Sequence, residues 1–301
     1  MSILVTGGAG FIGSNLVEEL LAAGEDVVVL DNMHTGSPEN LKGLVGNLRL
    51  IQGSCNDLPG MDLHPERIYH LGIPSSSPMY KKNPYLVGEA LNGFTAVFEL
   101  AKKSGSRVVY ASSSSLYNGL LPPHREDMTI RVADYYTEAR LAMERMAELY
   151  KQLYDVDSVG MRFFSVYGPK ETAKKQYANM VTQFLWEMQD AKTPIIFGDG
   201  LQTRDFTYVK DVTRALQMAM QSDYHGIVNV GTGKAYTFNQ TIDILNKAMG
   251  LDVKAQHVPN PIKNYVLHTL SDTTKSEKVL GFRARFNLVD GVKELLKSYA
   301  K

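Results

Sequence analysis

The sequence has little of several features that define whole classes of protein. Its one cysteine, Cys55, excludes a disulfide within the chain and a zinc site built from several cysteines. Lysine plus arginine and aspartate plus glutamate both number 32, so no basic excess attracts the chain to nucleic acid or a membrane surface. No apolar run approaches the roughly 18 residues of a membrane-spanning helix. Histidine does not cluster with Asp, Glu or Cys at metal-ligand spacing, so we predict no metal site.

The N-terminal stretch MSILVTGGAG also lacks the charged and then apolar pattern of a secretory signal, and its glycines come too early for one. The 301 residues are 44% hydrophobic and 21% charged, which is ordinary for a globular protein with a substantial core. These observations together predict a soluble, cytoplasmic protein.

Short apolar runs alternate with helical patterns through the first 160 residues. The runs expected to form strands are 2–6, 26–30, 48–51, 67–71, 107–112 and 158–163. Strands that are almost entirely apolar and alternate with helices are typical of a parallel sheet covered on both faces. The predicted fold class is therefore α/β, with a doubly wound parallel-sheet (Rossmann) domain.

The regular alternation ends near residue 165. Turn sequences rich in Pro, Gly or Asp follow at 168–170 and 198–200, and the last third mixes helices (240–249 and 288–299) with short strands. We expect residues 1–165 to form the dinucleotide-binding domain, with 205–232 returning to it. Residues 166–204 and 233–301 would then form a smaller, discontinuous α/β domain that binds the substrate.

A glycine-rich turn, TGGAGFIGSN, follows the first predicted strand and opens the first predicted helix. Gly7, Gly10 and Gly13 have the spacing of a dinucleotide fingerprint, in which the backbone approaches a pyrophosphate closely. Asp31 ends the second strand, where a carboxylate accepts hydrogen bonds from the adenosine ribose and repels a 2′-phosphate. The glycines alone could be an ordinary turn, and Asp31 a strand-end turn former. Their joint context predicts NAD rather than NADP.

The stretch DYYTEARLAMER places Tyr136 one helical turn before Arg140. A fixed positive charge beside a phenol favours phenolate, so the pair has the chemistry of a proton-transfer site. Taken alone, it is equally compatible with a surface ion pair or a packing tyrosine.

The motifs TGGAGFIG, HLGIPSS, ASSSSLY, Tyr-x-x-x-Arg, RFFSVYGP and GDGLQTRDFTYVKDV occur in this order. As a set they resemble the extended short-chain dehydrogenase/reductases, and within them the nucleotide-sugar epimerase/dehydratase family, the branch that includes UDP-glucose 4-epimerase. The resemblance extends from residue 2 to about residue 297.

The resemblance implies a catalytic set of Tyr136, Ser113 and Arg140. The tyrosine would exchange a proton with a sugar hydroxyl, and the serine would relay it. The family motif is Tyr-x-x-x-Lys, so Arg140 is a departure. A guanidinium keeps its charge, but its planar fork does not replace a flexible ammonium conservatively.

The residues after Ser113 bear on the type of reaction. By resemblance, dehydratases carry Asp-Glu here and decarboxylating members carry Glu at the second place, whereas this chain has Ser114 and Ser115. A serine hydroxyl is not a general acid near neutral pH, so elimination is disfavoured and epimerisation is the simpler interpretation.

The resemblance also assigns further contacts by position. The expected NAD contacts, besides Tyr136 and Arg140, are Gly7, Gly10, Phe11, Ile12, Gly13, Asp31, Asn32, Ser54, Cys55, Leu71, Gly72, Ile73, Phe163 and Val166. The expected substrate contacts are Ser75, Ser113, Ser114, Asn118, Tyr136, Ser165, Asn179, Phe197, Arg204, Lys263 and His268.

Several of these positions depart from the family pattern. Ser54 and Cys55 replace an Asp-Ile pair at the adenine, while Ala90 and Ser165 each replace an asparagine. Arg204 is the expected cation for a substrate diphosphate. A structural salt bridge from it to Asp205 or Asp211 is the alternative.

The predicted function is that of an NAD-dependent nucleotide-sugar epimerase, acting at C4 of a UDP-hexose through a transient 4-keto sugar. The alternatives are a nucleotide-sugar reductase or dehydrogenase, and a catalytically silent protein that binds the same molecules. The resemblance further implies a homodimer formed through the helices that contain 94–101 and 141–149, although core-facing helices show the same apolar pattern.

Overall fold

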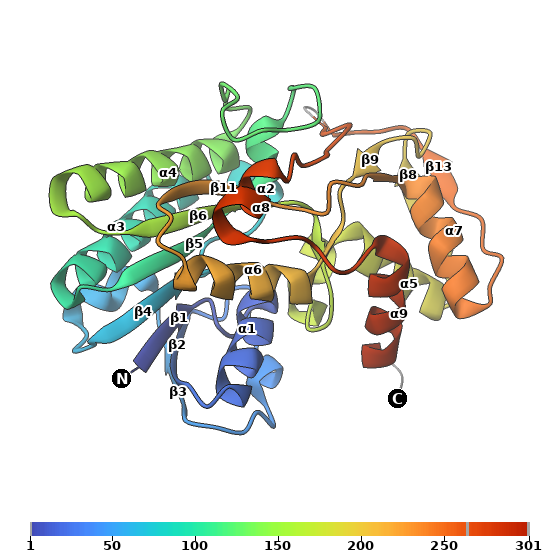
Figure 1. The fold of residues 1–301 in the computed structure, drawn as a ribbon. Helices are drawn as coiled ribbons and strands as arrows, with labels where there is room; N and C mark the ends of the chain where they lie inside the picture. Colours follow the sequence, from blue (N-terminus) through green and yellow to red (C-terminus); the bar gives the residue numbers. More distant parts are fainter. Residues whose placement is uncertain (1, 263–264, 300–301) are drawn as a thin grey trace.

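The computed structural model describes residues 2–262 and 265–299, and Lys263, one of the expected substrate contacts, lies outside them. Two parts lie side by side in Figure 1. The larger part is a twisted sheet with helices on both faces. The smaller part contains helices α5, α7 and α9 and several short strands.

The larger part is built on a seven-stranded sheet in which every pairing is parallel. Its strands, in the order in which they lie side by side, are β11 (Gly226–Val230), β6 (Ser158–Phe163), β5 (Arg107–Ser113), β4 (Pro65–His70), β1 (Ser2–Thr6), β2 (Asp26–Asp31) and β3 (Leu48–Gln52). The predicted fold class is confirmed. Because β11 pairs with β6, the chain returns to the sheet after it has entered the smaller part.

Each face of the sheet is covered by its own pair of long helices. Ile3 and Val5 of β1 pack in the core under α1 (Phe11–Ala22) and α6 (Val209–Gln221). Leu4, between them, packs in the core under α3 (Leu86–Ser104) and α4 (Tyr135–Tyr154). Successive residues of a strand point to opposite faces, so an unbroken apolar strand contributes to both cores.

Helix α4 begins where its sequence supplies a reciprocal cap. The Asp134 carboxylate accepts a hydrogen bond from the Thr137 amide (2.9 Å), and the Thr137 hydroxyl accepts one from the Asp134 amide (3.0 Å). Such a cap satisfies amides that have no partner within the helix. It fixes the first turn of the helix, which carries Tyr136.

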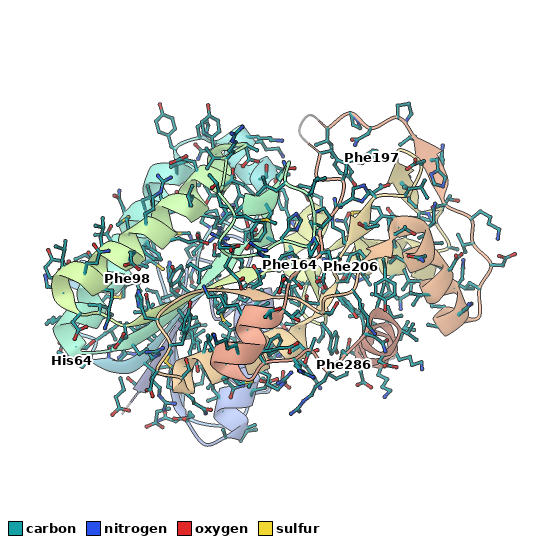
Figure 2. The ribbon with its side chains drawn as sticks, turned by 45° about the horizontal axis from the view of Figure 1, so that its top comes forward. His64, Phe98, Phe164, Phe197, Phe206 and Phe286 are labelled. Atoms are coloured by element: carbon teal, nitrogen blue, oxygen red, sulfur yellow. The ribbon has the colours of Figure 1, made fainter. Side chains whose placement is uncertain are left out.

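The smaller part surrounds a separate apolar core. It contains α5 (Met180–Gln189), α7 (Phe238–Met249) and α9 (Leu288–Tyr299). Its short strands pair as β8 (Ile195–Phe197) with β13 (Gln256–Val258), and β9 (Thr203–Arg204) with β12 (Tyr236–Thr237). The pair β7 (Val166–Tyr167) and β10 (Thr207–Tyr208) lies where the chain passes between the parts. Figure 2 shows Phe206 near the middle of the molecule and Phe197 farther out in the smaller part.

The remaining elements are short. They are α2 (Ser77–Lys82), α8 (Thr274–Leu280) and the 3-10 turns Pro38–Leu41, Cys55–Gly60, Ser114–Tyr117 and Thr172–Tyr177. Helix α8 contributes Leu280 to the core under α1 and α6, so part of the last third of the chain packs on the sheet. The division into two domains at the predicted boundaries stays a prediction.

The topology places a crevice at the carboxyl ends of the strands. β1 pairs with β2 on one side and β4 on the other, and the chain reaches these neighbours by crossovers in opposite directions. In open α/β sheets, ligands bind at such a switch point. None of the helices in the described ranges is long and apolar enough to cross a membrane.

Candidate active site

The glycine-rich turn after β1 has no room for side chains. Gly7 has a φ of +69°, and a Cβ there would lie 2.6 Å from the Gly72 amide nitrogen. A Cβ on Gly13 would lie 2.1 Å from the carbonyl oxygen of Gly7. Helix α1 then begins with no side-chain cap and no acidic residue in its first turn. The turn is therefore a backbone cradle at a helix N-terminus, which favours a phosphate group.

Asp31 lies at the end of β2, beside this cradle. One of its carboxylate oxygens accepts a hydrogen bond from the Ala9 amide (3.0 Å) and the other accepts one from the Met33 amide (2.8 Å). Burial raises the pKa of Asp31, and the backbone donors oppose that effect. The carboxylate is thus held in one place at the edge of the cleft.

One cleft of about 340 Å³ collects the expected cofactor residues. The sequence-predicted residues that line it at the dinucleotide end are Gly7, Gly10, Phe11, Ile12, Gly13, Asp31, Asn32, Ser54, Cys55, Leu71, Gly72 and Ile73. Burial raises the pKa of the Cys55 thiol to about 12, so this cysteine stays protonated and is not a nucleophile.

Tyr136 and Arg140 line the same cleft. Tyr136 is buried and meets the ring of Tyr80 edge to face, with the centroids 5.5 Å apart. The central carbon of the Arg140 guanidinium lies 4.9 Å from the Tyr136 ring centroid. A positive charge is therefore fixed beside the phenol.

Arg140 is held by backbone carbonyls rather than by a carboxylate. It donates to the carbonyl oxygen of Ala111 at the end of β5 (3.3 Å) and to that of Pro74 after β4 (3.0 Å). Its side chain is buried, and its Nε has no hydrogen-bond partner among the described residues. The guanidinium therefore links β5 to the loop after β4, and no carboxylate of the described residues forms an ion pair with it.

Four consecutive serines, 112–115, form a serine run in which the chain leaves the end of β5 and turns. The Ser113 hydroxyl accepts a hydrogen bond from the Ser115 amide (3.1 Å) and so caps the Ser114–Tyr117 turn, which ends at Asn118. Ser113, Ser114 and Ser115 line the cleft with Tyr136, as do Ser75, Phe163, Ser165 and Val166.

A buried ion pair lies behind the serine run. Glu144, one turn after Arg140, accepts two hydrogen bonds from Arg162 of β6 (3.0 and 2.7 Å) and one from the Ser112 hydroxyl (2.5 Å). Burial alone would lower the pKa of Arg162, but the hydrogen bonds and charge of Glu144 raise it. The sequence analysis did not identify this pair, although Tyr136, Arg140 and Glu144 recur every four residues on one helix face.

Some predicted substrate contacts in the described part of the chain do not line this cleft. They are Asn118, Asn179, Phe197, Arg204 and His268. Asn179 caps α5 by accepting from the Val181 amide (3.0 Å). Phe197, Arg204 and His268 belong to the smaller part, where Thr203 pairs with His268. Their substrate roles stay predictions.

Arg204 makes neither of the salt bridges considered from the sequence. It donates to the carbonyl oxygens of Thr203 (2.8 Å), Val266 (2.5 Å) and Leu267 (3.1 Å). Burial lowers the pKa of Arg204, an effect opposed by Tyr265. In this conformation the guanidinium fixes the segment after residue 265.

Comparison with known proteins identifies the family. The sequence profile described as "NAD dependent epimerase/dehydratase family" matches residues 3–231. The chain belongs to this family. Its cofactor is accordingly NAD, and it is a nucleotide-sugar enzyme of the epimerase/dehydratase type.

Individual relatives cover nearly the whole chain. A putative UDP-glucose 4-epimerase of Methanocaldococcus jannaschii is 32% identical over 98% of this chain and 97% of its own. UDP-glucuronic acid decarboxylase 1 of Arabidopsis thaliana is 28% identical over 99% of this chain and 70% of its own. The structure of UDP-glucose 4-epimerase from Thermotoga maritima with UDP-glucose is 29% identical, with a TM-score of 0.93 over 99% of this chain and 98% of that one.

The residues of the cleft fit the cofactor of the family. The cradle that a Cβ would fill at Gly7 and Gly13 suits a pyrophosphate, and the fixed carboxylate of Asp31 suits a ribose diol. Tyr136 and Arg140 would then lie at the nicotinamide end.

The first prediction concerns the buried ion pair. Glu144→Ala leaves the Arg162 charge buried without its partner, so the apparent free energy of unfolding should fall by about 3–5 kcal/mol. Glu148→Ala, one turn later on an exposed position of α4, should change it by less than about 0.5 kcal/mol. Denaturant titration of the NAD-free proteins measures both. Equal, small changes would contradict the structural role of Glu144.

The second prediction concerns Arg140. Lysine keeps the charge but cannot present the planar fork that reaches both the Ala111 and Pro74 carbonyls. Arg140→Lys should therefore lower kcat by about tenfold or more, since misplacing one catalytic group by about 1 Å is costly. Turnover of the natural substrate checks this. Unchanged or higher turnover would show that arginine merely stands in for lysine.

Proposed function

We propose that this protein is an NAD-dependent epimerase that inverts C4 of a UDP-hexose. The observation that carries the proposal is the cleft itself, which Tyr136, Arg140 and Ser113 line together with the residues of the glycine cradle. The similarity to UDP-glucose 4-epimerases over nearly the whole chain supports the same activity.

The serine run favours epimerisation over decarboxylation, an activity named among the relatives. Ser114 and Ser115 line the cleft where family members that eliminate or decarboxylate carry acidic residues. The carboxylates that line the described part of the cleft are those of Asp31, beside the glycine turn, and of Glu89 on α3. Neither carboxylate belongs to the serine run. The position at which decarboxylating family members carry an acid is therefore occupied by a serine in this chain.

The chain's own residues would act on the proton of the sugar hydroxyl. The Tyr136 phenol oxygen takes this proton and later returns it, with the Ser113 hydroxyl bridging phenol and sugar. The guanidinium of Arg140 lies 4.9 Å from the centroid of the Tyr136 ring, so the transfer would take place beside a fixed positive charge. Bound NAD supplies a reversible hydride acceptor. Epimerisation needs no additional acid, which agrees with the composition of the serine run.

Burial excludes another candidate proton carrier near the cleft. His70, at the end of β4, is fully buried, and its Nδ1 pairs with the Thr6 hydroxyl (2.8 Å). Burial, assisted by the charge of Arg140, lowers the pKa of His70 to about 3. The imidazole is therefore neutral at physiological pH, and proton transfer is left to Tyr136.

The substrate diphosphate would bind in the smaller part. Arg204, His268 and Phe197 lie on adjoining segments there, and Arg204 has a guanidinium suited to phosphate. For Arg204 to bind phosphate, it must exchange its contacts to the Val266 and Leu267 carbonyls for the ligand. The segment that contains these carbonyls would then rearrange when substrate binds.

A homodimer through α3 and α4 completes the proposal. These helices pack on each other, and Leu149, Leu153 and Tyr154 of α4 remain exposed. Exposed apolar side chains on a helix pair suit an isologous interface. Sedimentation of the purified chain distinguishes dimer from monomer.

The third prediction is the activity itself. The purified protein, incubated with UDP-glucose, UDP-galactose, their N-acetyl forms and the corresponding uronates, should interconvert one C4 pair without net consumption of NAD. Product analysis by NMR identifies the pair. Release of CO₂ from UDP-glucuronate would instead indicate a decarboxylase, and net turnover of added NAD a dehydrogenase or reductase. No change in any sugar, despite bound NAD, would indicate a binding protein.

A further inference from the structure

A lysine from a segment without any recognised motif reaches the cofactor cleft. Lys174 belongs to the 3-10 turn Thr172–Tyr177, more than 150 residues after the glycine turn, yet it lines the cleft together with Gly10, Phe11 and Gly13. Its Nζ lies 5.0 Å from the centroid of the Phe11 ring. Phe11 is the first residue of α1, so the ammonium group lies beside the N-terminus of that helix.

Three further contacts hold this segment on α1. The Asn15 side-chain amide donates to the Pro169 carbonyl (3.1 Å), and the Lys170 ammonium pairs with Glu18 (2.6 Å). Lys170 also donates to the Ser14 carbonyl (3.3 Å). The segment from Pro169 to Lys174 is thus fastened along the first turns of α1.

Glu171 fixes the position of Lys174. Its fully buried carboxylate accepts from the Lys174 Nζ (2.9 Å), the Asn179 amide (2.9 Å) and the Thr182 hydroxyl. One of three ammonium donors is used in this way, and the side chain is only 16% exposed. The lysine is therefore held in place while donors remain for a group in the cleft.

The negative charge of a pyrophosphate bound at the glycine cradle would need a cationic side chain nearby. A dinucleotide pyrophosphate carries two negative charges, but the glycine turn offers backbone amides and no charged side chain. In the described part of the chain, the cleft is lined by one arginine, Arg140, and one lysine, Lys174. Arg140 lies beside Tyr136 and is bound to two carbonyls. Lys174 lies beside the cradle.

We propose that Lys174 binds the pyrophosphate of NAD beside the glycine cradle, with Glu171 as its positioning residue. Charge-assisted hydrogen bonds to phosphate are stronger than neutral ones. The contact would also join the cofactor to the N-terminus of α5, because Glu171 binds Asn179 and Thr182 there. The proposal concerns cofactor retention and holds whichever sugar the enzyme converts.

Calorimetric titration of the NAD-free full-length protein tests this proposal with NAD, ADP and adenosine as probes. Lys174→Ala should weaken NAD and ADP binding about tenfold and leave adenosine binding unchanged, because adenosine lacks the phosphates. Lys174→Arg should retain most of the affinity. The matched control is Lys175→Ala, which removes the neighbouring exposed lysine of the same turn that does not line the cleft, and it should bind NAD as the wild type does.

A neutral double variant separates phosphate binding from damage to the fold. Glu171→Gln with Lys174→Met leaves no unpaired buried charge, and it should show the same loss for NAD and ADP. It should also reduce the dependence of NAD affinity on salt concentration. Unchanged NAD affinity in both Lys174 variants would overturn the proposal. An equal loss for adenosine would overturn it as well.

Discussion

The buried ion pair between Glu144 and Arg162 is the interaction on which the rest of the site depends. It joins α4 to β6, and the Ser112 hydroxyl extends it to β5. Both charged side chains are less than a tenth exposed, so each needs the other to offset the loss of water. Because Tyr136, Arg140 and Glu144 share one helix face, fixing Glu144 also fixes the two residues that face the cleft.

Arg140 makes this arrangement different from a site built with lysine. Its planar fork spans from the Ala111 carbonyl to the Pro74 carbonyl, so one side chain joins the ends of two neighbouring strands. The same guanidinium stays close to the Tyr136 ring without a carboxylate partner. It therefore acts as a structural link between these segments and places a fixed charge beside the phenol ring.

The sequence predicted most of the fold and part of the site, for physical reasons that differ between residues. The strands were recognisable because a parallel strand buried on both faces is almost entirely apolar. The glycine turn was recognisable because its backbone is packed so closely that a Cβ on Gly7 would meet Gly72 and one on Gly13 would meet Gly7. Lys174 and the pair Glu144–Arg162 were not recognised. Their roles come from contacts between segments far apart in the sequence, and no local spacing signals such contacts.

The smaller part was the least predictable. Arg204 does not form the salt bridge considered from the sequence but donates to the carbonyl oxygens of residues 203, 266 and 267, and its phosphate role stays a prediction. Backbone acceptors leave no trace in the residue pattern, so sequence reasoning could not find them. Asp205 is instead surrounded by donors from Thr232, Gly233 and Ser271, and it joins three chain segments between the two parts.

The central claim is that the phenol of Tyr136 moves the proton of the sugar hydroxyl within an intact, NAD-loaded site. The most direct test compares the turnover and bound NAD content of the wild type and Tyr136→Phe, with the sugar that the wild type converts. We expect turnover to fall by about 10²-fold or more, while the bound NAD and the thermal midpoint of unfolding stay unchanged. A phenylalanine variant that retains wild-type turnover would contradict the account.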